Sequence, residues 1–313
     1  MNIYQKEYLI GKGSYGRVYA CKNTKTGEDV AIKSMPLIEN GLLEVNTCIE
    51  ATLLTHLEHP NIMKPKDIIM NNNNIYIVMP LIKRTLDVVD KNIIYKILLA
   101  LEYLHKNNII HRDIKPSNIL YDGYNPIIID FSLSVLNMGQ KLTHEVYTTA
   151  YRAPEITQGK QYSYNADIYA LGISLRFLLD KNYHSHPLHD IIESMLQSNP
   201  YRRPNASDLL KHPIFSEFTP PPSYPIKFPV VKYACPKDFG NLFDVVSNAI
   251  FIINHKHSPR FSEHFSNFIN YLTTMIINDS PIQNRPKIPP SVCRDIASLI
   301  FCNIYPCIVY QSS

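Results

Sequence analysis

Alternating apolar and polar residues open the chain and predict a set of short β-strands. Three such stretches lie within residues 4–35, where glycines separate them. The alternation repeats every second residue, which is the period of a strand with one buried face. Residues 66–80 predict two more strands around a run of asparagines, and residues 42–57 carry apolar side chains at helical spacing. The first 82 residues therefore predict a five-stranded sheet with one helix.

Helical periodicity dominates the next region of the chain, up to about residue 216. One face of residues 91–108 consists almost entirely of isoleucine and leucine, which is typical of a helix packed on a core. The predicted helices cover residues 91–108, 166–180, 187–198 and 205–211. Between the first two of these, short apolar runs predict small strands or loop edges. The pattern as a whole predicts an α+β protein with a small β region and a larger, mostly helical region.

A proline-rich segment separates this helical region from the rest of the chain. Residues 219–229 contain five prolines, and that density continues neither a helix nor a central strand, so a stiff linker is predicted. Residues 238–305 then carry three further apolar patterns at helical spacing. The predicted units are a β region over residues 1–82, a helical region over 83–216, a linker over 217–229 and a helical extension of unassigned role over 230–313.

Composition and charge exclude several classes of protein. The 31 Lys and Arg against 27 Asp and Glu give a net charge of +4 that is spread along the chain. Nucleic-acid-binding proteins usually concentrate basic residues on one face, so no nucleic-acid partner is expected. The six cysteines form no C-x-x-C pair, which disfavours a zinc ribbon and fits a reducing intracellular compartment, cytoplasmic or nuclear. No apolar run approaches the roughly 18 residues of a membrane helix, so no membrane partner is expected.

Three glycines and a lysine at the end of a strand are the first candidates for binding phosphate. Gly11, Gly13 and Gly16 lie between the first two predicted strands, where the lack of a Cβ lets backbone N–H groups approach phosphate oxygens. A dinucleotide fingerprint has the same glycines but opens a helix, whereas a strand follows here. Lys33 ends the third strand and needs an anionic partner there, either a phosphate or a carboxylate. Glu50, on the predicted helix, is the candidate carboxylate.

The sequence HRDIKPSN, residues 111–118, is the strongest single signal. It places a carboxylate, an ammonium and an amide within six positions: Asp113, Lys115 and Asn118. A carboxylate can accept a hydroxyl proton, an ammonium can neutralise a phosphoryl group, and an amide oxygen can ligate a hard cation. Asp130 follows an apolar run 17 residues after Asp113 and can complete a magnesium site.

These motifs, in this order, resemble those of eukaryotic-type protein kinases over residues 1 to about 216. The matching motifs are the glycine loop, VAIK ending at Lys33, HRDIKPSN, Asp-Phe-Ser from Asp130, and Ala-Pro-Glu ending at Glu155. Asp167 and Arg203 match the family's buried aspartate and the partner of Glu155. The resemblance implies a bilobal kinase fold, ATP and Mg2+ as cofactors, and protein substrates.

The resemblance also implies a role for individual residues. Lys33 holds the α- and β-phosphates and is fixed by Glu50, while Asp113 orients the acceptor hydroxyl and accepts its proton. Lys115 neutralises the γ-phosphoryl group, and its position after Asp-Ile indicates Ser/Thr rather than Tyr substrates. Magnesium ligands are Asn118 and Asp130. The remaining nucleotide contacts are Ile10, Gly11, Gly13, Ser14, Gly16, Val18, Ala31, Met79, Pro80, Ile82 and Leu120.

Within the family the glycine loop and the activation segment around Thr143 lean towards cyclin-dependent kinases. Residues 44–50 lack the cyclin-binding helix signature, which disfavours a cyclin-like activator without excluding one. Phosphorylation of Ser14 or Tyr15 is expected to inhibit, because it places negative charge beside ATP. Ile49 and Val135 stand where the relatives carry arginines that bind phosphorylated Thr143, so that phosphate is expected to matter less here.

Two departures from the family pattern keep a second hypothesis open. Ser132 replaces the glycine after Asp-Phe and is expected to restrict this segment if a positive φ is required. The interval from Asp167 to Arg203 is short, so one helix and the insert of the cyclin-dependent branch are expected to be missing. The alternative is a pseudokinase or nucleotide-binding scaffold, with residues 230–313 binding a partner.

Overall fold

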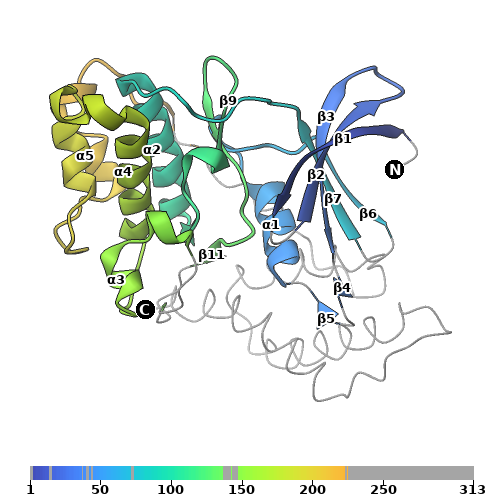
Figure 1. Ribbon diagram of the computed structural model, residues 1–313, viewed down its shortest axis with the longest axis horizontal. Coiled ribbons are helices and arrows are strands. Elements are labelled where there is room, and N and C mark those ends of the chain that lie inside the picture. The colour runs from blue at the N-terminus through green and yellow to red at the C-terminus, as the bar shows by residue number, and fades with distance from the viewer. Residues whose placement is uncertain are drawn as a thin grey trace.

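A small sheet-bearing lobe and a larger helical lobe make up the described residues of the chain in the computed structural model (Figure 1). The small lobe comes first in the sequence, so the predicted order of a β region and a helical region is confirmed. The structure describes residues 3–13, 16–36, 38–39, 42–43, 45–71, 74–136, 142, 147–222 and 224. Most of the proline-rich segment and the whole predicted helical extension, residues 230–313, lie outside the described residues.

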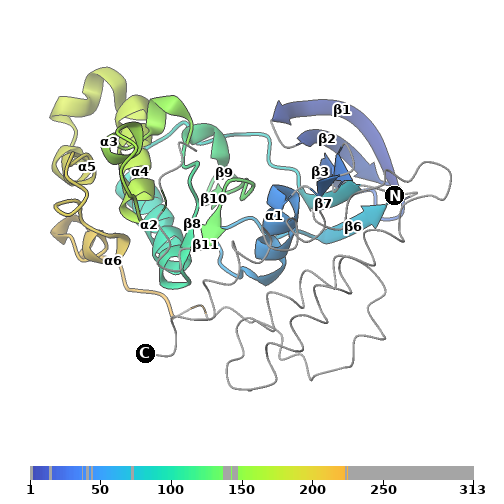
Figure 2. The same ribbon diagram turned by 90° about the horizontal axis from the view of Figure 1, so that it is seen from below.

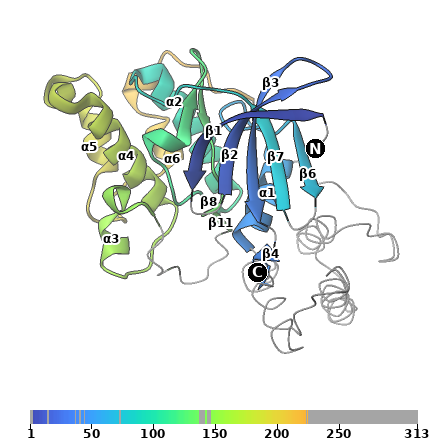
Figure 3. The same cartoon turned by 45° about the vertical axis from the view of Figure 1, so that its right-hand side comes forward.

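The small lobe is built on a five-stranded antiparallel sheet with the order β1-β2-β3-β7-β6. Its strands are β1 Tyr4–Gly13, β2 Gly16–Asn23, β3 Asp29–Pro36, β6 Asp67–Asn71 and β7 Asn74–Pro80. Figure 3 shows the strands fanned side by side. The predicted five strands are all present, and burial is concentrated in the central strand β3 and its neighbours β2 and β7.

Helix α1, Val45–His56, lies between this sheet and the helical lobe in the views of Figures 1 and 2. Its prediction from residue 42 was wrong at the start. Leu42–Leu43 form strand β5 instead, which pairs with β4, Ile38–Glu39. The sequence between these strands is Asn-Gly, the preferred dipeptide of tight hairpins, and this local signal outweighs the helical spacing.

The helical lobe centres on α2, Lys91–Lys106, and α4, Asn165–Leu179. The Asp90 side chain caps α2 by accepting a hydrogen bond from the N–H of Ile93 at 2.8 Å. The helix ends before the predicted residue 108, since Asn108 adopts a left-handed φ of 60°. The other helices are α3 Pro154–Thr157, α5 His189–Met195 and α6 Ala206–Leu209, with 3-10 turns η1 Pro116–Asn118, η2 Thr149–Tyr151, η3 Asp180–Ser185 and η4 Pro213–Phe215.

Helices α5 and α6 are shorter than the sequence patterns predicted. Between Leu179 and Ala206, all of it described, the chain forms only η3 and α5 before α6 begins. Asp180 ends α4 with a left-handed φ of 43°, and this break starts the η3 turn. The segment between the two motif residues Asp167 and Arg203 is therefore built from little more than α4 and one short helix.

Two short antiparallel ladders flank the candidate catalytic segments. β8, Ile109–Ile110, pairs with β11, Val135–Leu136, and β9, Ile119–Tyr121, pairs with β10, Pro126–Ile128. They lie beside α1 in Figure 2. The two loops that leave these ladders, after β8 and after β10, hold the residues of HRDIKPSN and Asp-Phe-Ser.

One hydrophobic core runs through the helical lobe and reaches the sheet. The buried face of α2 forms its centre, and it continues through α1 to β3 and β7. Its fully buried members include Met35, Ile77, Ile94, Leu98, Leu101, Phe131, Ile168 and Leu171. Each such side chain contributes about 1.5–3 kcal/mol on burial, so the core holds the two candidate loops against a rigid base. Among the described residues, none of the helices has the length and apolar character needed to cross a membrane.

Candidate active site

The loop after β8 is held in place by the buried carboxylate of Asp167 on α4. Its Oδ2 accepts a hydrogen bond from the N–H of His111 at 2.8 Å and its Oδ1 accepts one from the N–H of Arg112 at 2.9 Å. Burial would raise the pKa of Asp167, but the hydrogen bond and charge of His105 and the backbone donor lower it. Arg112 has a left-handed φ of 67°, and these bonds offset the strain of that conformation.

Three side chains surround the carboxylate of Asp113. Lys115 Nζ and Asn118 Nδ2 each donate to Oδ2 at 2.7 Å. Thr148 Oγ1 donates to Oδ1 at 2.7 Å and accepts from Lys115 Nζ at 2.8 Å. Sequence reasoning missed Thr148, which lies 35 residues further along the chain; its position between the activation segment and Ala-Pro-Glu was the available signal.

The amide of Asn118 is oriented by its nitrogen. Nδ2 donates to the backbone oxygen of Asp113 at 2.9 Å as well as to its carboxylate. The amide oxygen is then the atom of Asn118 that remains to ligate a cation. A short 3-10 turn, η1, carries the side chain, and the residue is buried.

The ammonium of Lys33 joins the sheet, helix α1 and the segment after β10. Lys33 Nζ lies 2.7 Å from both carboxylate oxygens of Glu50 and 2.7 Å from Asp130 Oδ1. Lys33 is 8% exposed and Glu50 1%. Residues from strand β3, from α1 and from a loop 97 positions away from Lys33 thus meet at one cation.

Burial and the Lys33 charge act in opposite directions on the two carboxyl groups. Burial raises the pKa of Glu50 to about 6 even though Lys33 lowers it. For Asp130, burial also raises the pKa, but the charge and hydrogen bond of Lys33 and the hydroxyl of Ser132 lower it to about 2. Asp130 is therefore ionised at neutral pH and presents a full carboxylate charge.

Ser132 does not adopt the positive φ on which its expected restriction depended. The left-handed residue of this segment is Asp130, with φ of 65°, and Ser132 is not among the residues with positive φ. The Ser132 hydroxyl instead donates to Asp130 Oδ1 at 2.7 Å. The serine is tied to the segment by its side chain, and the condition of a positive φ, on which the expected restriction depended, is not met here.

The remaining predicted nucleotide contacts lie on the small lobe and on β9. Ala31 and Met79 are direct partners on β3 and β7, and Val18 faces Lys33 across β2 and β3. Leu120 lies in the middle of β9, and Ile10, Gly11 and Gly13 lie on β1, with Gly16 opening β2. Ser14, Tyr15 and Thr143 lie outside the described residues.

The packing of β2 against β3 explains why position 16 is a glycine. A Cβ at this position would lie 2.5 Å from the Ser34 carbonyl oxygen and 2.9 Å from Met35 Cγ. Any side chain would displace the backbone of β3, which carries Lys33. The close packing of β2 on β3 therefore requires glycine here irrespective of phosphate binding.

The donor set near Asp113 fits a hard cation such as magnesium. Asn118 retains its amide oxygen, and Asp130 retains Oδ2, which receives no hydrogen bond from the described residues. The protein thus offers a cation only two oxygen ligands, one from a carboxylate and one from an amide. Magnesium is commonly bound in this way, through one or two carboxylates, substrate phosphates and water. Within the described residues no cluster of three His, Cys, Asp or Glu side chains could hold a metal on its own.

Glu155 and Arg203 form a buried ion pair in the helical lobe. Arg203 donates to both carboxylate oxygens at 2.8 and 3.0 Å, and its guanidinium lies 4.9 Å from the ring centre of Tyr169. This pair joins α3 to the segment after α5. It contacts none of the candidate catalytic groups, so its role is structural.

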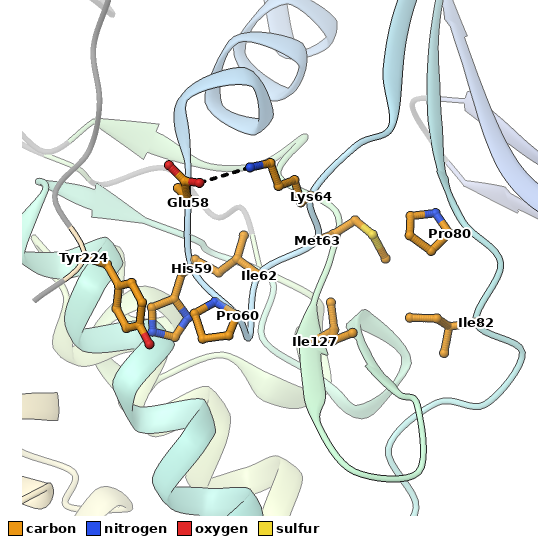
Figure 4. Close-up of a pocket in the computed structure, with 10 residues that line it drawn as sticks. All are labelled: Glu58, His59, Pro60, Ile62, Met63, Lys64, Pro80, Ile82, Ile127 and Tyr224. Atoms are coloured by element: carbon orange, nitrogen blue, oxygen red, sulfur yellow. Dashed lines mark hydrogen bonds and ion pairs between the residues drawn. The ribbon is translucent and has the colours of Figure 1, made fainter. Parts of the chain in front are cut away.

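A separate apolar cavity of about 350 Å³ lies between the loop after α1 and the segment after β7 (Figure 4). The side chains of Pro80 and Ile82 face it, together with His59 and Tyr224. The sequence predicts Pro80 and Ile82 as nucleotide contacts. Because their side chains line this cavity, such contacts would be made by the backbone carbonyl of Pro80 and the N–H of Ile82, and they stay a prediction.

Comparison with known proteins shows the family. The protein kinase domain family matches residues 4–186, which is more than half of the chain. The chain is also similar to the SNF1-related protein kinase catalytic subunit alpha KIN12 of Arabidopsis thaliana, with 32% identity over 257 residues, 69% of this chain and 52% of that protein. It spans about half the length of this curated relative. On the family match and the fold, the chain belongs to the protein kinase family.

Proposed function

We propose that this protein is a serine/threonine protein kinase that transfers the γ-phosphoryl group of ATP to hydroxyls of protein substrates. The grouping around Asp113 carries the proposal. The Lys115 ammonium and the Asn118 amide both lie 2.7 Å from the Asp113 carboxylate. Asp130 follows Ile129, whose N–H donates to the backbone oxygen of Asn118 at 3.0 Å, and its carboxylate bonds Lys33 of the small lobe. Phosphoryl transfer depends on positioning and electrostatic stabilisation, and these groups supply both.

Asp113 is the group proposed to orient the acceptor hydroxyl and take its proton. The donors from Lys115 and Thr148 hold its two oxygens in a fixed orientation. The Lys115 ammonium lies beside the same carboxylate, where it can neutralise charge on the oxygens of the transferred group. The acceptor hydroxyl and the phosphoryl group would therefore meet beside a base and a cation that lie in contact with each other.

Lys33 is proposed to bind the α- and β-phosphates. Its ammonium already forms ion pairs with Glu50 and Asp130, so its position is fixed before a nucleotide binds. Asn118 Oδ1 and Asp130 Oδ2 are the atoms proposed to hold magnesium. When bound, the ion would neutralise phosphate charge and orient the β- and γ-phosphates.

Ser/Thr substrates and the closer relationships within the family belong to the same proposal. Lys115, two residues after Asp113, supports Ser/Thr substrates, and the similar plant protein is named a protein kinase catalytic subunit. The closer resemblance to cyclin-dependent kinases, which rests on the glycine loop and on the activation segment up to Ala-Pro-Glu, stays a prediction of the sequence. Residues 217–229 as linker and 230–313 as helical extension stay predictions of the sequence.

A nucleotide-binding scaffold without turnover is the second candidate, and the observation behind it is the short segment between α4 and α6. Incubation of the full chain with Mg-ATP on a peptide array separates the two. The proposal expects phosphate on Ser and Thr peptides but not on Tyr peptides. ATP binding without any transfer would support the scaffold instead.

A further inference from the structure

Ser132 lies directly against the Asp130 carboxylate in the segment after β10. Its hydroxyl donates to Oδ1 at 2.7 Å, and its backbone N–H donates to the same oxygen at 3.4 Å. Ser132 is 3% exposed, so bulk water does not compete for this hydroxyl. Asp130 has a left-handed backbone with φ of 65°, a conformation that non-glycine residues adopt only when their surroundings fix it.

The second side-chain donor to Asp130 Oδ1 is Lys33, but its ammonium is shared with other acceptors. Lys33 Nζ also bonds both oxygens of Glu50, and a nucleotide phosphate would compete for this ammonium. The Ser132 hydroxyl has Asp130 Oδ1 as its acceptor and lies on the side chain that follows the carboxylate by two residues. The Ser132 hydroxyl can therefore keep its hydrogen bond to Asp130 when a nucleotide binds.

The hydroxyl also leaves the other carboxylate oxygen free. Both side-chain donors, Lys33 and Ser132, are on Oδ1, and no described residue donates to Oδ2. The carboxylate is thus held by one oxygen and open at the other. A cation ligand needs this arrangement, because a donor on the ligating oxygen would compete with the cation.

We propose that Ser132 is a positioning residue whose hydroxyl holds the Asp130 carboxylate in the orientation that leaves Oδ2 for the cation. This inference rests on the proposed function of the site. A glycine at position 132, the residue found in the resembling kinases, has no hydroxyl for this task. Ser132 therefore stabilises the cation site, and its presence in place of glycine is no evidence that the protein is inactive.

The matched variants are Ser132→Ala, Ser132→Thr and Ser134→Ala. The alanine at 132 frees the carboxylate, which must then be ordered when the cation binds, and ordering one side chain weakens binding by about three- to tenfold. The threonine keeps a hydroxyl. Ser134 is 1% exposed and its hydroxyl donates to the His111 carbonyl at 3.2 Å, so Ser134→Ala removes a buried hydroxyl from the same segment without touching Asp130.

The experiment is calorimetric titration of the full chain with ATP over a series of Mg2+ concentrations and in EDTA. Ser132→Ala should raise the Mg2+ concentration for half-maximal binding by about three- to tenfold while leaving ATP affinity in EDTA unchanged. Ser132→Thr and Ser134→Ala should stay within about twofold of wild type. A midpoint for Ser132→Ala within about twofold of wild type would overturn the proposal, and so would an equal loss with and without Mg2+, which marks a merely structural role.

Calorimetry measures Mg-ATP binding, and the peptide array measures phosphoryl transfer, so the two proposals are tested separately. Wild-type protein that binds Mg-ATP but phosphorylates no peptide contradicts the proposed function, and the comparison of the Ser132 variants still decides the positioning role. Wild-type protein that binds ATP no better with Mg2+ than in EDTA overturns the positioning role itself. Thermal unfolding checks each variant, and Ser132→Gly replaces Ser132→Ala in the same titration if the alanine variant does not fold.

Discussion

Thr148 donates a 2.7 Å hydrogen bond to the Asp113 carboxylate and accepts one of 2.8 Å from Lys115. The threonine precedes η2, and the two partners belong to the loop after β8. One hydroxyl therefore joins the end of the activation segment to the proposed base and to the proposed phosphoryl-binding cation. It fixes their separation before substrate binds.

Removal of this hydroxyl should slow phosphoryl transfer. A hydrogen bond to a charged group contributes about 1.5–3 kcal/mol, so Thr148→Ala should lower kcat/KM about tenfold to a hundredfold. Thr148→Ser keeps the hydroxyl and should retain most activity. The neighbouring Thr149, which is exposed, supplies the control Thr149→Ala. An unchanged rate in Thr148→Ala would show that this hydroxyl has no role in catalysis.

Glu155→Gln should destabilise the fold strongly. Arg203 and Glu155 have side-chain exposures of 0% and 3%, and loss of one partner leaves a buried charge uncompensated, at a cost of about 3–5 kcal/mol. The free energy of unfolding in urea measures this. Glu217→Gln breaks the exposed pair with Lys91 and should cost less than about 1 kcal/mol. A loss below about 1 kcal/mol in Glu155→Gln would contradict the structural role of the pair.

His59 should make the protein less stable in mild acid. Burial lowers the pKa of His59 to about 4, and Nδ1 accepts a hydrogen bond from the N–H of Asn61 at 3.1 Å, which needs the neutral ring. The unfolded chain takes up a proton near pH 6.5 and the folded chain does not until about pH 4. The histidine therefore costs no stability above pH 6.5, and stability falls as pH drops through this window.

The size of the effect follows from the same two pKa values. From pH 7.5 to 5.0, wild type should lose about 2 kcal/mol more free energy of unfolding than His59→Gln, which lacks the titrating group. Urea unfolding at both pH values measures the difference. His184→Gln, at an exposed histidine, should follow wild type. Equal pH dependence in wild type and His59→Gln would contradict the lowered pKa, because it would mean that the folded and the unfolded chain protonate His59 at the same pH.

Lys33→Met should raise the pKa of Glu50 beyond about 6. Burial already raises this pKa and the Lys33 ammonium opposes the rise. Removal of the ammonium leaves burial and the Asp130 charge opposed only by the backbone hydrogen bond of Phe131. The pKa of Asp130, about 2 with Lys33 present, should rise too. Titration of the 13C carboxyl signals, with Glu50→Gln for assignment, measures both groups. A lower pKa for Glu50 in Lys33→Met would contradict the ion pair.

Local patterns predicted much of the fold. The five strands and the long helices α2 and α4 follow from apolar periodicity, which acts over neighbouring residues. The contact of Lys33 with Glu50 could be anticipated, because a lysine at the end of a buried strand needs an anion. Motif spacing within HRDIKPSN likewise sets which side chains share one loop.

Contacts between distant segments could not be predicted in this way. Thr148 meets Asp113 only because the chain returns to the loop after β8, and a single threonine carries no periodic signal. The bond from Ser132 to Asp130 depends on a backbone conformation, φ of 65° at Asp130, that sequence pattern does not show. The β4–β5 hairpin was missed because an Asn-Gly signal competed with helical spacing over the same residues.

Phosphoryl transfer by wild type and Asp113→Asn, measured side by side with ATP binding, tests the central claim most directly. The full chain is incubated with Mg-ATP and the Ser/Thr peptide that wild type phosphorylates best, and calorimetry measures nucleotide affinity for both proteins. The account predicts that Asp113→Asn binds ATP as wild type does and loses transfer by at least about a hundredfold. Full turnover in Asp113→Asn, at unchanged ATP affinity, would contradict the assignment of Asp113 as the base.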